Sequence, residues 1–160
     1  MDTTERARTT ARLLVNLARV GDLDGVSRIV RLLTDPACPQ RERLRQMLSE
    51  LLCAAGTMVL RQTGGAGAGA AIVLDLRRID GSTVDIDELR PEVRAMVRAL
   101  LAEVNDHRED TLDQLELALD GTGEGLVDGV TLVLLWTVSA MTWCEEHDEP
   151  APVWLATTAA

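Results

Sequence analysis

The chain has 160 residues, of which sixteen are arginine and twenty-six are acidic; it contains no lysine and carries a formal net charge of −10. This length predicts one domain that folds without disulfides. The acidic balance excludes nonspecific nucleic-acid binding, which requires clustered cations. Three cysteines without metal-type spacing, and an N-terminus without an apolar signal region, favour a reducing bacterial cytoplasm.

Charge is divided unequally along the chain. Residues 1–74 contain ten arginines against seven acids, whereas residues 75–160 contain six arginines against nineteen acids. Regions of opposite sign attract each other, within one chain or across a head-to-tail dimer. A solvated acidic surface is the alternative interpretation.

Helical periodicity predicts three helices in the first half. The first covers residues 3–20, with apolar side chains at helical spacing, and Gly21-Asp22 ends it. Val26, Ile29, Val30 and Leu33 form the apolar face of a shorter second helix. After the break at residues 35–39, a third helix is expected over residues 40–62.

Residues 63–71 form a Gly-rich linker. A phosphate-binding loop is disfavoured here, because the chain has no lysine and the glycines follow a helix rather than a strand. Alternation from Ile72 to Leu76 predicts a strand, Asp80-Gly81 a tight turn and Thr83–Ile86 a returning strand. The expected element is a small β-hairpin over residues 72–86.

Three further segments follow the hairpin. The clearest helical period of the chain covers residues 91–105. Thr111 and Gln114 have the spacing of a capping box that opens a short helix, which the glycines of residues 121–125 end. Residues 126–143 then form a long apolar segment.

The apolar segment carries no charge from Gly129 to Trp143. It is too short to cross a bilayer, which takes about 18 to 20 apolar residues, because Asp128 and Glu145 flank it. We expect a helix buried on most of its circumference. Its many β-branched residues leave a buried strand as the alternative.

The order of long helix, turn and short helix, then long helix occurs twice. Leu17–Asp22 aligns with Leu101–Asp106, and Val26, Ile29 and Leu33 align with Leu112, Leu115 and Leu119. The expected fold is therefore mainly α, with about six helices arranged as two related three-helix units and a small β-hairpin between them. The domain would cover residues 1–149, with halves 1–62 and 87–144, and a tail would follow at 150–160.

Catalytic chemistry has little support in the sequence. The two histidines, His107 and His147, lie among acids without the spacing of a known metal site. No serine lies in a nucleophile elbow, and no cysteine has an adjacent activating residue. We expect no enzyme activity, no metal site and no cofactor.

Three non-catalytic functions remain. The first is a small acidic helical protein that mediates protein–protein interaction as an adaptor, chaperone-like or regulatory partner. Val153, Trp154 and Leu155 follow Pro-Ala-Pro and resemble an aromatic anchor for a groove. Packing of Trp154 on its own domain is the alternative. The partner would be another protein, including a second copy of the chain, with no direct nucleic acid and no membrane.

The second function is a small-molecule-binding regulatory domain in which Trp136 and Trp143 line a cavity. Core packing is the commoner reason for such residues. The third is an acidic mimic that occupies a nucleic-acid-binding partner, which requires the acids of residues 103–128 to form one stripe.

Overall fold

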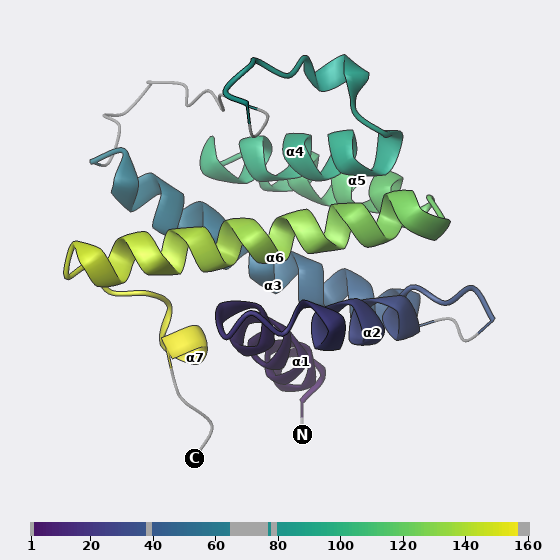
Figure 1. Ribbon diagram of the computed structural model, residues 1–160, viewed down its shortest axis with the longest axis horizontal. Coiled ribbons are helices and arrows are strands. Elements are labelled where there is room, and N and C mark those ends of the chain that lie inside the picture. Colours follow the sequence, from purple (N-terminus) through teal and green to yellow (C-terminus); the bar gives the residue numbers. More distant parts are fainter. Residues whose placement is uncertain (1, 38–39, 65–76, 78–79, 157–160) are drawn as a thin grey trace.

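The computed structural model describes residues 2–37, 40–64, 77 and 80–156 (Figure 1). This part of the chain is mainly helical, which confirms the predicted fold class. Its helices are α1 (Thr3–Arg19), α2 (Leu23–Leu33), α3 (Arg41–Gln62), the 3-10 helix η1 (Ile86–Glu88), α4 (Pro91–Val104), α5 (Arg108–Leu119), α6 (Gly123–Glu146) and α7 (Val153–Ala156).

α3 and α6 lie at the centre of the bundle and pack against each other. In Figure 1 both helices run from right to left, with α4 and α5 on one side of α6 and α1 and α2 on the other. One hydrophobic core contains side chains from all seven α-helices. The core therefore joins both halves of the chain.

The two halves repeat the same set of helix contacts. In the first half α1 packs on α2 and on α3, and in the second α4 packs on α5 and on α6. Between the halves, α1 and α2 contact α6, whereas α4 and α5 contact α3. Among the described helices, α1 does not contact α4 and α2 does not contact α5. The helix contacts of the first half therefore have counterparts in the second half.

The turn after the first helix has the same geometry in both halves. Gly21 has φ +80° and Asp106 has φ +59°, and each ends its helix in the left-handed conformation. The amide of Gly21 donates to the carbonyl of Ala18, as that of Asp106 does to Glu103, both at 3.1 Å. Gly21 therefore matches Asp106, one position away from the sequence alignment, which paired Asp22 with Asp106.

The buried faces agree with this corrected register. In α2 and α5 the buried pairs are Val26 with Thr111, Val30 with Leu115, and Leu33 with Ala118. Matching Leu44 of α3 to Leu126 of α6 pairs the following buried residues: Met47 with Gly129, Leu48 with Val130, Leu51 with Val133, Leu52 with Leu134, Ala55 with Thr137, and Met58 with Ala140.

The predicted β-hairpin is not supported by the described residues, which contain no strand. Residues 72–76 of the first expected strand lie outside them. Arg77 and Thr83 form an isolated antiparallel bridge around Gly81, which has φ +84°. The return strand Thr83–Ile86 is wrong: the Asp85 side chain accepts a hydrogen bond from the Asp87 amide at 3.0 Å and starts η1.

Two helices begin earlier than predicted. α5 begins at Arg108, and Thr111 is an interior residue whose hydroxyl donates to the His107 carbonyl at 3.2 Å instead of capping the helix. α6 begins at Gly123, so Gly123 and Gly125 belong to the helix rather than to the break. The helix interpretation of the apolar segment is confirmed, and the strand alternative is wrong.

By its length and composition alone, α6 could cross a membrane. Within its most apolar window, 56% of the residues are buried inside the bundle. A helix in the core of a soluble protein can have the same length and composition, so these two properties do not assign α6 to a membrane.

Candidate interaction site

One side of α6 points away from α3 and the core. It lies at the front of the bundle in Figure 1. Leu135 is 48% exposed, and Ser139 and Thr142 are also exposed. We call this surface the α6 outer face, and its members are Thr131, Leu132, Leu135, Trp136, Ser139, Thr142 and Trp143. It belongs to a segment without charge, Gly129–Cys144.

Trp136 and Trp143 lie at one edge of the α6 outer face. Both are half-buried and pack against the core with part of their rings. The Trp143 ring stacks on His147 with centroids 4.2 Å apart and 17° between planes. The sequence singled out these tryptophans but missed Leu132 and Leu135. A helical wheel of the segment would have placed both leucines beside Ser139 and Thr142.

The two ends of the α6 outer face are acidic. At its start, Glu124 accepts a hydrogen bond from Arg31 at 2.6 Å and Asp128 accepts one from Arg90 at 3.1 Å. The hydrogen bond and positive charge of Arg31 lower the pKa of the Glu124 carboxyl. At its other end lie four exposed acids, Glu145, Glu146, Asp148 and Glu149.

The corresponding surface of α3 is mixed and includes two charged residues, with Ala54 and Leu60 as its apolar members. In the register that matches Leu44 to Leu126, Cys53 lies where α6 has Leu135, and Thr57 lies where α6 has Ser139. Glu50 and Arg61 occupy the positions of Leu132 and Trp143. Glu50 also accepts a hydrogen bond from Arg8 at 2.7 Å. The two central helices therefore expose different chemistry.

The C-terminal residues predicted as a partner anchor lie against α1, which α7 contacts. Leu155 is buried in the core, and Trp154 is half-buried. Arg12 donates to the Trp154 carbonyl at 3.2 Å, and the Arg8 guanidinium carbon lies 5.6 Å from the Trp154 ring centroid. Val153 is 82% exposed. Of the three predicted anchor residues, Val153 is therefore the most exposed in this conformation.

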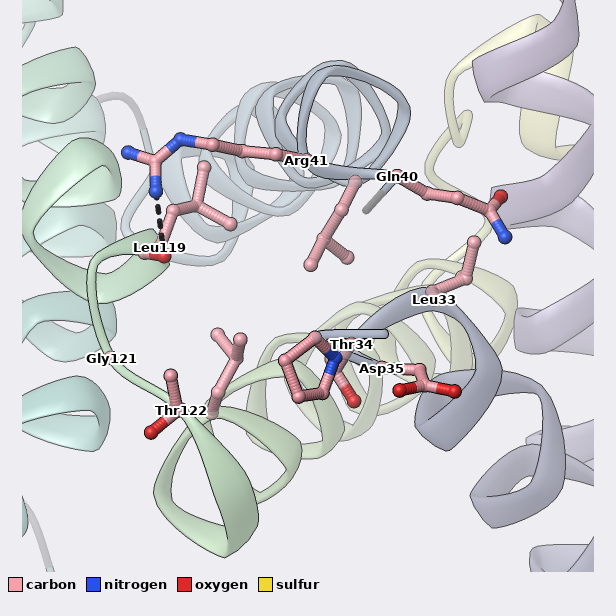
Figure 2. Close-up of a pocket in the computed structure, with 11 residues that line it drawn as sticks. Leu33, Thr34, Asp35, Gln40, Arg41, Leu119, Gly121 and Thr122 are labelled. Carbon is pink, nitrogen blue, oxygen red and sulfur yellow. Dashed lines mark hydrogen bonds between the residues drawn. The ribbon is translucent and has the colours of Figure 1, made fainter. Parts of the chain in front are cut away.

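A cavity of about 200 Å³ lies where the α2–α3 and α5–α6 loops meet (Figure 2). Its wall includes Leu33, Leu119 and Arg41, and Arg41 donates to the Leu119 carbonyl at 2.8 Å. Arg41 also binds Glu116 at 2.8 Å. Ligand pockets usually measure roughly 300–1,000 Å³, so this cavity is small. Neither Trp136 nor Trp143 lines it.

Ion pairs join the basic first half of the chain to the acidic second half. They include Arg19 with Glu145, Arg31 with Glu124, Arg41 with Glu116 and Asp120, and Arg45 with Glu116. Regions of opposite charge therefore face each other within one chain. The nucleic-acid mimic would need the acids of residues 103–128 to form one stripe. Several of these acids are already paired with arginines, among them Glu116, Asp120, Glu124 and Asp128.

Within the described residues, no group of three or more His, Cys, Asp or Glu side chains is placed to hold a metal ion. His107 lies 3.8 Å from Asp110, and His147 contacts Trp143. Burial raises the pKa of the Cys144 thiol.

Comparison of the chain with models of protein families, with curated proteins and with solved structures finds no match.

Proposed function

We propose that this protein is a non-catalytic interaction module, built from two related three-helix units, which binds another protein through the α6 outer face. The observation that carries the proposal is an exposed, uncharged helix face at a position where the counterpart helix carries Glu50 and Arg61. Exposed faces of helices in globular proteins usually carry charged and polar residues. A contiguous apolar face on the surface is typical of an interaction site.

The dimensions of the α6 outer face suit a helical partner. The uncharged segment Gly129–Cys144 spans roughly 24 Å at 1.5 Å per residue. Covering its apolar side chains removes them from water, which favours a complex. Leu132 and Leu135 are one helical turn apart and would contact the same partner helix.

The composition of the face supports binding rather than catalysis. Its polar members are the hydroxyls of Thr131, Ser139 and Thr142, and none of them belongs to a nucleophile–base pair among the described residues. The neighbouring Cys144 is buried, and its raised pKa disfavours the thiolate that nucleophilic attack requires.

The other two functions stay as weaker alternatives. A small-molecule site would use a cavity away from the tryptophans, such as the one near Arg41 or one of about 480 Å³ between α1 and α3, whose wall includes Thr3, Arg6 and Arg43. An acidic mimic would have to use acids that lie outside the interhelical ion pairs. The tail is a weaker candidate for the contact, because Trp154 and Leu155 already pack on the helical domain.

The experiment is affinity capture from lysate of the source organism with the full chain and two matched variants. Leu135→Gln places an amide in the α6 outer face, and Cys53→Gln places the same group at the counterpart position of α3. We expect a stoichiometric partner to be retained by the unsubstituted chain and by Cys53→Gln. Leu135→Gln should weaken capture at least about tenfold, because an unpaired amide would be buried.

Circular dichroism would verify that both variants keep their helical content. Equal capture by Leu135→Gln and Cys53→Gln would contradict the proposal. So would a partner that is lost only when the tail after Glu149 is removed.

A further inference from the structure

The acids at the C-terminal end of the α6 outer face are arranged for a cationic partner. Glu146, Asp148 and Glu149 are exposed, and Asp148 has φ +53°, which turns the chain directly after the helix. Among the described residues of this cluster, an ion pair is found for Glu145 alone, with Arg19. Three negative charges therefore lie next to the apolar face without an ion pair to any arginine in the described part of the chain.

The opposite end of the face differs in this respect. Glu124 and Asp128 already bind Arg31 and Arg90. The face thus has an apolar middle, one end whose acids are paired, and one end whose acids are available. This asymmetry gives a docked partner a preferred orientation.

Charge favours a cationic occupant over a second copy of the chain. Two parallel α6 faces would bring the C-terminal acids together. Two antiparallel faces would bring Glu146 of each copy near Asp128 of the other, whose charge Arg90 already offsets, so a second copy brings no unpaired cation to Glu146, Asp148 and Glu149. Like charges placed opposite each other in an interface cost several kcal/mol in general. The net charge of −10 adds repulsion at longer range.

We propose that the α6 outer face docks an amphipathic helix whose apolar side covers Leu132, Leu135 and Trp136, and whose arginine or lysine residues at one end pair with Glu146, Asp148 and Glu149. The apolar half of this inference rests on the proposed function above. The cationic half rests on the distribution of acids along the same helix. Amphipathic helices are commonly recognised through their apolar side, and complementary charges fix the orientation of a bound partner.

The test uses designed 18-residue peptides as probes. Each carries a leucine stripe at helical spacing, and three arginines stand at its N-terminal end in one peptide and at its C-terminal end in another. Matched controls carry three glutamates at the same positions. Binding to the full chain is measured by fluorescence anisotropy at 50 and 300 mM salt.

We expect the arginine peptide of one orientation to bind at least tenfold more tightly than its glutamate control, and this difference should shrink at high salt. The triple variant Glu146→Gln, Asp148→Asn and Glu149→Gln should abolish the difference. Asparagine keeps the left-handed conformation accessible at position 148. A control with the same charge change elsewhere, Asp35→Asn, Glu42→Gln and Asp113→Asn, should preserve it.

The outcomes separate this inference from the proposed function. Equal binding of the arginine and glutamate peptides, or an equal effect of both triple variants, would overturn the cationic partner. If Leu135→Gln still abolished lysate capture in that case, the interaction function would stand. A dimer in size-exclusion chromatography with light scattering that Leu135→Gln dissociates would overturn the inference in favour of a second copy.

Discussion

α3 and α6 are equivalent on their buried sides and different on their exposed sides. The buried pairs Leu48 with Val130 and Leu52 with Leu134 occupy matching places in one core. On the exposed side, Cys53 corresponds to Leu135. Packing constrains the buried residues of both helices in the same way, so it does not account for the apolar character of the α6 outer face. The proposed interaction function would account for that character.

The two central helices also differ at one pair of matching buried positions. Gly129 of α6 corresponds to Met47 of α3. A Cβ atom at Gly129 would lie 3.2 Å from the Met96 Cγ and 3.4 Å from the Glu92 carbonyl oxygen. α4 therefore approaches α6 closely at Gly129, as it also does at the buried Gly125, where a Cβ atom would lie against the Glu92 side chain.

The largest effect is expected in the shared core. Leu52→Ala and Leu134→Ala should each lower the free energy of unfolding by about 2–5 kcal/mol, because both side chains are fully buried and leave cavities. Urea unfolding followed by tryptophan fluorescence measures this. A loss below 1 kcal/mol in one variant alone would break the equivalence of the two helices.

The next effect concerns the close approach of α4 to α6. Gly129→Leu should lower the free energy of unfolding by about 1–3 kcal/mol through overpacking against Met96 and the Glu92 backbone. Ser139→Leu, on the exposed side of the same helix, is the control and should leave stability nearly unchanged. Thermal unfolding of both variants decides between a local clash and a general effect of leucine.

A smaller effect is expected for the ion pairs between the halves. Arg41→Gln should cost about 0.2–1 kcal/mol at pH 7, because exposed pairs are screened by water. Hydrogen bonds from Arg41 and Arg45 lower the pKa of Glu116 from its ordinary value of 4.5. A lowered folded-state pKa stabilises the fold above the ordinary value and loses that stabilisation as pH falls through the lowered one.

The difference in stability between Arg41→Gln and the unsubstituted chain should therefore shrink as the pH falls below 4.5 and Glu116 becomes protonated. Urea unfolding at a series of pH values from 7 to 2.5 measures it. A difference that is constant across this range would mean that Arg41 acts through packing alone.

The smallest effect on stability is expected at the exposed pair. Leu135→Gln and Cys53→Gln should each change the free energy of unfolding by less than about 0.5 kcal/mol, as surface substitutions usually do. If Leu135→Gln lowered the free energy of unfolding by more than about 2 kcal/mol and Cys53→Gln did not, Leu135 would belong to the core and not to the interaction site.

The helices were predictable where the apolar period is interrupted by polar residues, as in α1, α2 and α4. The hairpin was not, because alternation at residues 83–86 does not reveal that Asp85 binds the Asp87 amide. Thr111 has capping-box spacing, yet the turn at Asp106 comes first and starts the helix earlier. Local hydrogen bonds of aspartate therefore decided both errors.

The α6 outer face was missed because α6 is apolar around most of its circumference, which weakens the contrast by which periodicity identifies a buried side. The remaining signal was the placement of Leu132 and Leu135 beside Ser139 and Thr142 on a helical wheel. The packing of the bundle then shows that Leu135 is exposed and Leu134 is buried. The tail sequence was also ambiguous. An apolar Leu155 after Pro-Ala-Pro is compatible both with packing on α1 and with binding to a partner.

The most direct test of the α6 outer face as an interaction site is photo-cross-linking in cells of the source organism. A photoreactive phenylalanine analogue is placed at position 135 in one variant and at position 53 in the other. We expect a protein adduct at position 135, through a peptide with an apolar stripe that ends in arginine or lysine, and none at position 53. Adducts of equal yield at both positions, or at position 53 alone, would contradict the account.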